Sequence, residues 1–264
     1  MTANVAPSAE VESAHRQDLA TALRAAYLHG FHEGIDNHFS VALGPDRFML
    51  NRYGPHWSEM TTDDILTVDV EGNLLQGDGT YEKAAFYIHR AVHQARPDAT
   101  VVFHTHMPYA TAVALSDEGL ITTASQAAMF FHNRVKMVPY GGIATAEEEG
   151  ERLRSYFEQD ANGTVDTVLL KNHGVVVTGR TVAEAWQRLY FLERACQVQV
   201  MAQSTGQPVR RVSDEVAELT YQQWVGTEER TAQALFDAMR RMVARTPAGS
   251  TGVTELSGSQ AILG

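Results

Sequence analysis

An apolar run that ends in two closely spaced histidines places the tightest constraint on this chain. Residues 101–103 are Val-Val-Phe, and they lead directly into His104-Thr105-His106. A segment of small residues follows and predicts the start of a helix. Side chains alternate across a β-strand, so residues two apart point the same way. His104 and His106 would therefore leave the strand side by side. Imidazole nitrogen binds Zn, Fe, Ni or Cu, and such an ion needs at least one further ligand.

A third histidine stands at a predicted turn. Two β-branched runs, 167–170 and 175–177, flank the link KNHG, a pattern that predicts a hairpin or a bent pair of strands. Gly174 permits a tight turn and a close approach of the backbone. If this pair lies beside the strand that ends at His104, the His173 imidazole joins the other two. Three histidines leave coordination positions open for water or substrate, as catalytic metal sites do.

The remaining periodicity mixes helices with strands. Helices are predicted over 11–28, 82–94, 108–115, 125–131, 145–157 and 181–203, with one or two more over 214–244. Further strands are predicted over 39–43, 47–51, 65–70 and 135–138. Successive strands joined by tight turns indicate local antiparallel pairing and not a strict βαβ alternation. Residues 1–10 are interpreted as a flexible leader, 11–245 as a single domain and 246–264 as a disordered tail rich in Gly, Ser and Thr.

Composition narrows the class of protein. The formal charge of −11 argues against nucleic-acid binding, which needs clustered Lys and Arg. The single cysteine, Cys196, excludes an intrachain disulfide, and no apolar run reaches the ~18 residues of a membrane span. The N-terminus lacks the basic and apolar regions of a signal peptide. We therefore expect a cytoplasmic protein with no membrane partner.

Three segments carry a family resemblance. HTHMPYATA, the preceding HRAVHQARPD and the later LLKNHGVVVTG resemble the class II aldolase/adducin family, and the resemblance runs from about residue 16 to residue 203. It implies an α/β fold, a three-layer α/β/α sandwich around a mainly antiparallel central sheet. It also implies a small-molecule substrate and a homotetramer with its sites near subunit interfaces. The implied cofactor is a divalent metal, with Zn expected first and Fe(II) or Mn as alternatives.

The same resemblance implies roles for individual residues. The metal ligands would be His104, His106 and His173. The early DNHFS is similar to the family's Gly-Asn-x-Ser loop, and NRYG is similar to a second substrate-side loop. The implied substrate contacts are Asn37, Ser40, Asn51 and Gly54, with Tyr109 as a further candidate that could equally be a core or interface aromatic. His38, next to Asn37, is the best general-base candidate in these loops.

One departure from the family pattern affects the predicted chemistry. Sugar-phosphate aldolases of this family have an acid/base glutamate four residues before the histidine that corresponds to His89, and Ala85 stands there instead. Glu82 lies one helical turn earlier and could replace it, or could be an exposed acid favoured by the helix dipole. His89 and His93, four residues apart, are expected to face the core or support the site. The family's paired-serine phosphate loop is also replaced, by GDGT at 77–80, which makes a sugar phosphate a less favoured substrate.

Three functions remain open on this pattern. The leading one is a metal-dependent, aldolase-type carbon–carbon lyase that acts on a small hydroxy-ketone or keto-acid and stabilises an enolate. The second is a non-heme Fe(II) oxygenase or a decarboxylase of aromatic keto acids, because three histidines without the glutamate also suit that chemistry. The third is a non-catalytic, adducin-like scaffold.

Overall fold

A single eight-stranded sheet organises the chain. The computed structural model describes residues 7–142, 147–160 and 163–250. The strands are β1 (His38–Ala42), β2 (Arg47–Asn51), β3 (Ile65–Asp69), β4 (Leu74–Gln76), β5 (Val101–Thr105), β6 (Val135–Val138), β7 (Thr167–Leu170) and β8 (Gly174–Gly179). Their order across the sheet is β4-β3-β2-β1-β5-β8-β7-β6. The β6–β7 pair is parallel and the other pairs are antiparallel, so the mainly antiparallel sheet is confirmed.

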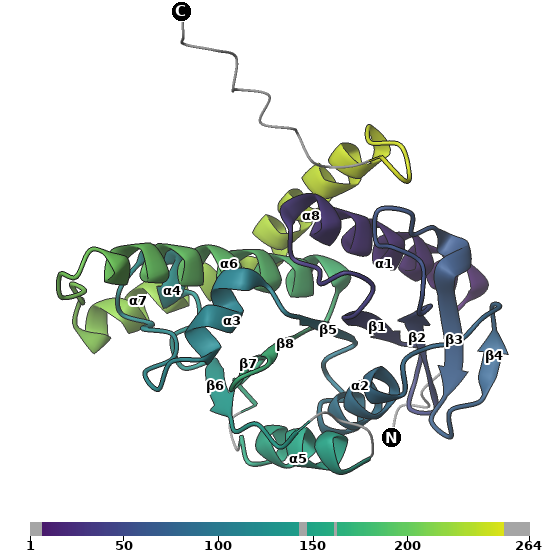
Figure 1. The fold of residues 1–264 in the computed structure, drawn as a ribbon, viewed down its shortest axis with the longest axis horizontal. Coiled ribbons are helices and arrows are strands. Elements are labelled where there is room, and N and C mark those ends of the chain that lie inside the picture. The colour runs from purple at the N-terminus through teal and green to yellow at the C-terminus, as the bar shows by residue number, and fades with distance from the viewer. Residues whose placement is uncertain (1–6, 143–146, 161–162, 251–264) are drawn as a thin grey trace, which may run out of the picture.

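Helices cover both faces of this sheet. They are α1 (Ala9–His29), α2 (Lys83–Ala95), α3 (Pro108–Ala114), α4 (Gln126–Met129), α5 (Glu147–Glu158), α6 (Val182–Ser204), α7 (Asp214–Val225) and α8 (Glu228–Ala244), with a 3₁₀ turn at Thr62–Asp64. Figure 1 shows α1, α6 and α8 above the sheet and the pair α2 and α5 below it. The result is the three-layer α/β/α sandwich that the resemblance implied.

Alternation along the central strands separates two cores. On β1, Phe39 and Val41 face the large core under α1, α6 and α8. On β5, Val102 faces the opposite way, into the core that Ile88 and Val92 of α2 complete. Because side chains two apart share a face, His104 follows Val102 toward the α2 side of the sheet. The strand periodicity thus directs the first histidine into the layer between the sheet and α2.

The boundaries differ from the sequence expectations in a few places. Strand β4 was not predicted, because its three residues are all exposed and show no alternation of burial. Helix α1 begins at Ala9, with Ser8 as its N-cap, two residues before the start predicted at residue 11. The first residues of the helix predicted over 145–157 and the part of the predicted tail from residue 251 lie outside the described residues. No helix in the described part of the chain is long and apolar enough to cross a membrane.

Candidate metal centre

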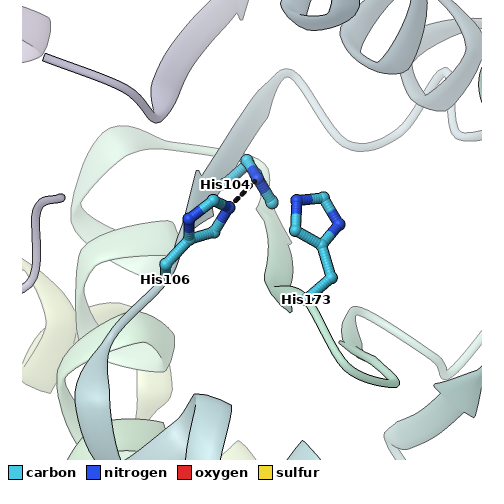
Figure 2. A group of neighbouring side chains, drawn as sticks. All are labelled: His104, His106 and His173. Atoms are coloured by element: carbon cyan, nitrogen blue, oxygen red, sulfur yellow. Dashed lines mark hydrogen bonds between the residues drawn. The ribbon is translucent and has the colours of Figure 1, made fainter. Parts of the chain in front are cut away.

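Three histidines meet at one end of the central strand pair β5 and β8. His104 ends β5, His106 follows it, and His173 lies in the turn just before β8. Strands β5 and β8 pair directly, with Thr105 opposite Val175. Figure 2 shows the three rings turned toward one another, and one ligand nitrogen from each lies within 4.8 Å of the others. The prediction that these strands are neighbours and bring three imidazoles together is confirmed.

Gly174 allows His106 and His173 to approach. A Cβ atom at this position would lie 2.6 Å from the Thr105 carbonyl oxygen and 2.6 Å from Cδ2 of His106. The first contact is with backbone, which cannot move aside cheaply. Any larger residue would therefore push the β7–β8 turn away from β5 and separate His173 from the other two rings.

The hydrogen bonds of these rings leave free lone pairs that point at one another. Nδ1 of His104 lies 2.9 Å from the Val175 carbonyl oxygen, which can only accept, so this nitrogen carries the proton. His106 Nδ1 contacts a carboxylate oxygen of Glu33 and donates to it. The two Nε2 atoms, 3.1 Å apart, are then both unprotonated in the neutral rings. Two lone pairs at this distance repel unless a cation lies between them, so the donor set fits a metal ion.

Burial and neighbouring histidines favour the neutral form of two of these rings, His104 and His173. Burial, followed by the neighbouring His38, His173 and His106, holds the pKa of His104 well below its usual range. Burial and then His106 lower the pKa of His173 to about 4. Neutral imidazole is the form that binds a metal, so His104 and His173 can bind a cation at pH 7 without first losing protons.

Glu33 is a site residue that the sequence interpretation missed. It lies in the loop between α1 and β1 and contacts Nδ1 of His106, a separation of 73 residues. Asn37 connects this loop to the site, because its Oδ1 accepts the Glu33 amide proton at 3.0 Å and the His106 amide proton at 3.4 Å. Its Nδ2 is buried without a hydrogen-bond partner. A carboxylate behind a metal-binding histidine fixes the tautomer and orientation of the ring.

His38 and Glu82 lie together beside the triad. The His38 ring stacks on His104 with centroids 4.7 Å apart, since the two residues are paired across β1 and β5. Glu82 is the N-cap of α2, and its carboxylate lies 4.0 Å from Nε2 of His38. Burial and then Asp36 raise the pKa of Glu82, while His106 opposes them. The candidate replacement for the family's glutamate therefore lies next to the candidate base.

Ser40 is buried behind the candidate metal centre, whereas the resemblance implied a contact with substrate. It is fully buried, and its hydroxyl contacts His89 and, at 2.8 Å, Nε2 of His93. His89 Nε2 in turn lies 2.7 Å from Nδ1 of His38. Ser40 thus connects two histidine rings behind His38, and this placement gives it no open path to a substrate. His89 and His93 support the site, as one interpretation of the sequence held.

The remaining candidates divide between structural contacts and open loops. Ala85 packs in a small apolar cluster with Phe48 and Phe86, so no polar group replaces the family's glutamate at that position. Asn51 is buried and its Oδ1 accepts the Phe39 amide proton at 2.8 Å. Tyr109 packs against the large core. Gly54 is exposed in a loop, with φ +110° and open space around it.

A comparison with family models identifies the group to which this chain belongs. Residues 17–200 match the model of the Class II Aldolase and Adducin N-terminal domain. The chain is a member of the class II aldolase/adducin family. The resemblance on which the sequence interpretation relied is thereby confirmed.

Relatives in this family carry different activities in their names. A Caulobacter vibrioides protein named "Putative aldolase class 2 protein" is 36% identical over 220 residues, 82% of this chain and 83% of its own length. Decarboxylase NovR of Streptomyces niveus is 30% identical over 179 residues, 67% of this chain and 64% of its own. The structure of L-fuculose 1-phosphate aldolase from Glaciozyma antarctica PI12 superposes with a TM-score of 0.75 at 25% identity, covering 92% of this chain and 96% of that one.

Proposed function

We propose that this class II aldolase/adducin protein is a metal-dependent carbon–carbon lyase that cleaves a small hydroxy-ketone or keto-acid. The observation that supports it most strongly is the pair of unprotonated Nε2 atoms of His104 and His106, 3.1 Å apart, with His173 beside them. A divalent ion bound there, Zn in our proposal, would supply Lewis-acid stabilisation of the negative charge that develops on a substrate oxygen. We expect this ion to leave positions open for the substrate.

The chain offers groups for the two proton transfers of a retro-aldol cleavage. A base must take the proton of the substrate hydroxyl as the carbon–carbon bond breaks, and an acid must protonate the released carbon. His38 is neutral because of burial and can accept a proton. Glu82 has a raised pKa and lies 4.0 Å from His38, so it is the proposed acid. The unpartnered Nδ2 of Asn37 is a donor suited to a substrate oxygen.

A decarboxylase or Fe(II) oxygenase of aromatic keto acids is the second candidate on the same three histidines. The position of the family's glutamate is occupied by Ala85, which packs in the core, and a relative bears the name of a decarboxylase. Both reactions need the substrate carboxylate held at the metal but do not need a glutamate at that position. The oligomeric state is also part of the proposal: a homotetramer, with the sites near subunit interfaces.

The decisive experiment combines metal analysis with product assays. We expect purified wild type to hold a divalent metal in equimolar amount, and His104→Ala and His106→Ala to lose it. His132→Ala, which removes a buried histidine outside the site, is the matched control. Unchanged metal content in the site variants would refute the metal proposal. Aldehyde release, CO₂ release and O₂ uptake then separate lyase, decarboxylase and oxygenase, while an empty wild-type site would favour a non-catalytic scaffold.

A further inference from the structure

A continuous line of hydrogen bonds runs behind the metal centre, between the sheet and α2. It starts at the Ala99 carbonyl oxygen, 3.3 Å from Nδ1 of His93. His93 Nε2 lies 2.8 Å from the Ser40 hydroxyl, which also contacts Nδ1 of His89. His89 Nε2 lies 2.7 Å from Nδ1 of His38. We call these four side chains, from His93 to His38, the relay chain.

The carbonyl at its start fixes the direction of every bond in the relay chain. A carbonyl oxygen only accepts, so Nδ1 of His93 carries the proton and Nε2 has the lone pair. The Ser40 hydroxyl must then donate to His93, and with its one proton used it can only accept from His89. His89 therefore donates through Nδ1, and its Nε2 accepts from Nδ1 of His38.

This deduction requires neutral rings, and burial supplies them. Burial lowers the pKa of His93 to about 4, with the Ala99 carbonyl opposing it. Burial also holds the pKa of His89 well below its usual range, with His93 and His104 adding to the effect. A neutral imidazole has one N–H and one lone pair, so settling one nitrogen settles the other.

We propose that the relay chain holds His38 as the tautomer whose unprotonated Nε2 faces Glu82 at the edge of the metal centre. His38 is then an acceptor on the side of the site, ready to take a proton or to accept a hydrogen bond from substrate. His89, Ser40 and His93 are positioning residues that act only through His38. That the lone pair serves as the catalytic base rests on the proposed lyase function, whereas the tautomers themselves do not depend on it.

The first test is neutron diffraction from deuterated crystals of the metal-free protein at pH 7.5. We expect deuterium on Nδ1 and none on Nε2 of His38, His89 and His93, and the Ser40 deuterium directed at His93. Deuterium on Nε2 of His38 would overturn the proposal. Because neither metal nor substrate is present, this result is independent of whether the protein proves to be a lyase.

A single substitution at His93 should reverse the direction of the hydrogen bonds in the relay chain. In His93→Phe the Ser40 hydroxyl has lost its acceptor and turns to donate to Nδ1 of His89. His89 then donates from Nε2 to Nδ1 of His38, and His38 carries its proton on Nε2. His93→Gln offers an amide oxygen in place of the lost lone pair and should restore the wild-type order. An unchanged His38 tautomer in folded His93→Phe would refute the mechanism.

Activity gives the second readout. We expect His93→Phe to lower kcat by about 10²-fold, the lower range for a general base, with KM and metal content unchanged. His93→Gln should recover most of this loss. His132→Phe, which removes a buried histidine hydrogen-bonded to Thr122, is the matched control and should change neither tautomer nor kcat. A lyase assay that fails in wild type, with the predicted tautomers present, would reject the reaction but leave the relay chain standing.

Discussion

Two buried clusters of polar side chains in the described part of the chain are built on opposite principles. One is the histidine region, which comprises the candidate metal centre and the relay chain and is built from neutral imidazoles. The other we call the ionic cluster: Arg134, Asp166, Arg188 and Glu228, all less than a tenth exposed. Both lie at the ends of sheet strands, so position alone does not distinguish a site from a structural joint.

The charged side chains of the ionic cluster pair with one another. Arg134 donates to Asp166 at 2.8 Å and to Glu228 at 3.2 Å, and Arg188 donates to Glu228 at 2.8 Å. Two cations face two anions, and the contacts tie the segments before β6 and β7 to α6 and α8. A buried charge network that is complete offers nothing to a ligand, and we assign it a structural role.

The histidine region is incomplete by the same measure. The Nε2 atoms of His104 and His106 point at one another without a proton between them, and Nδ2 of Asn37 has no partner. Buried polar groups are normally paired, so unpaired ones that converge mark a place for something the chain does not supply. The contrast shows that the presence or absence of partners for the buried polar groups, more than burial or polarity, separates the candidate site from the ionic cluster.

The largest effect is expected from breaking the ionic cluster. Arg134→Met leaves the buried carboxylates of Asp166 and Glu228 with Arg188 as the cation that they share within the cluster. Removing one partner of a buried pair costs about 3–5 kcal/mol. Urea unfolding at pH 7.5 measures the loss. Metal content should stay at the wild-type level, because no contact of Arg134 reaches the triad in the described residues. Loss of metal with retained stability would show that we have assigned the two clusters wrongly.

Acid should weaken the two clusters in different pH windows. The pKa of His93 is about 4 in the fold against 6.5 unfolded, so the unfolded chain binds the extra proton first. The contribution of His93 to the free energy of unfolding is then complete above pH 6.5 and falls by about 3 kcal/mol as the pH drops to 4. For Glu228, burial raises the pKa but Arg188 and Arg134 outweigh it and lower it. Its contribution is present above the unfolded value of 4.5 and is lost only below it.

Urea midpoints measured from pH 7.5 to 3.5 separate these windows. We expect His93→Gln to make the slope between pH 6.5 and 4 shallower without changing the part below pH 4. The other buried histidines, whose pKa values are also lowered, carry the rest of that slope. An unchanged slope in the upper window in folded His93→Gln would mean that His93 carries none of it.

A smaller effect should follow from neutralising the carboxylate behind His106. Glu33→Gln removes the charge that orients the His106 ring, and loss of such a partner weakens metal binding about 10- to 100-fold. Competition with a zinc chelator measures the affinity. Stability of the metal-free protein should be unchanged, because the Glu33 side chain is 62% exposed. Glu71→Gln, in the exposed turn after β3, is the control and should bind zinc like wild type.

Local patterns predicted the candidate metal ligands, and long-range contacts determined their surroundings. The alternation of side chains along a strand predicted that His104 and His106 lie side by side, and the turn pattern predicted the position of His173. Both signals depend only on neighbouring residues. Glu33 was missed because its contact spans 73 residues from a loop without periodicity. Ser40 was placed at the substrate by its motif, but packing of α2 against β1 brings His89 and His93 onto its hydroxyl and closes it off.

The smallest effect tests whether burial gives the ionic cluster its value. Arg154 on α5 pairs with Glu158 at 2.7 Å, as close as the contacts of Arg134, but at the surface. An exposed pair four residues apart on a helix contributes only about 0.3–0.5 kcal/mol, because water screens it and the side chains lose entropy. Arg154→Met is therefore the matched control for Arg134→Met, and urea unfolding in 0.05 and 0.5 M salt should show a loss near the detection limit (about 0.3 kcal/mol) that salt reduces further. If Arg154→Met costs as much as Arg134→Met, pairing and not burial sets the stability of these contacts, and the ionic cluster has no special structural role.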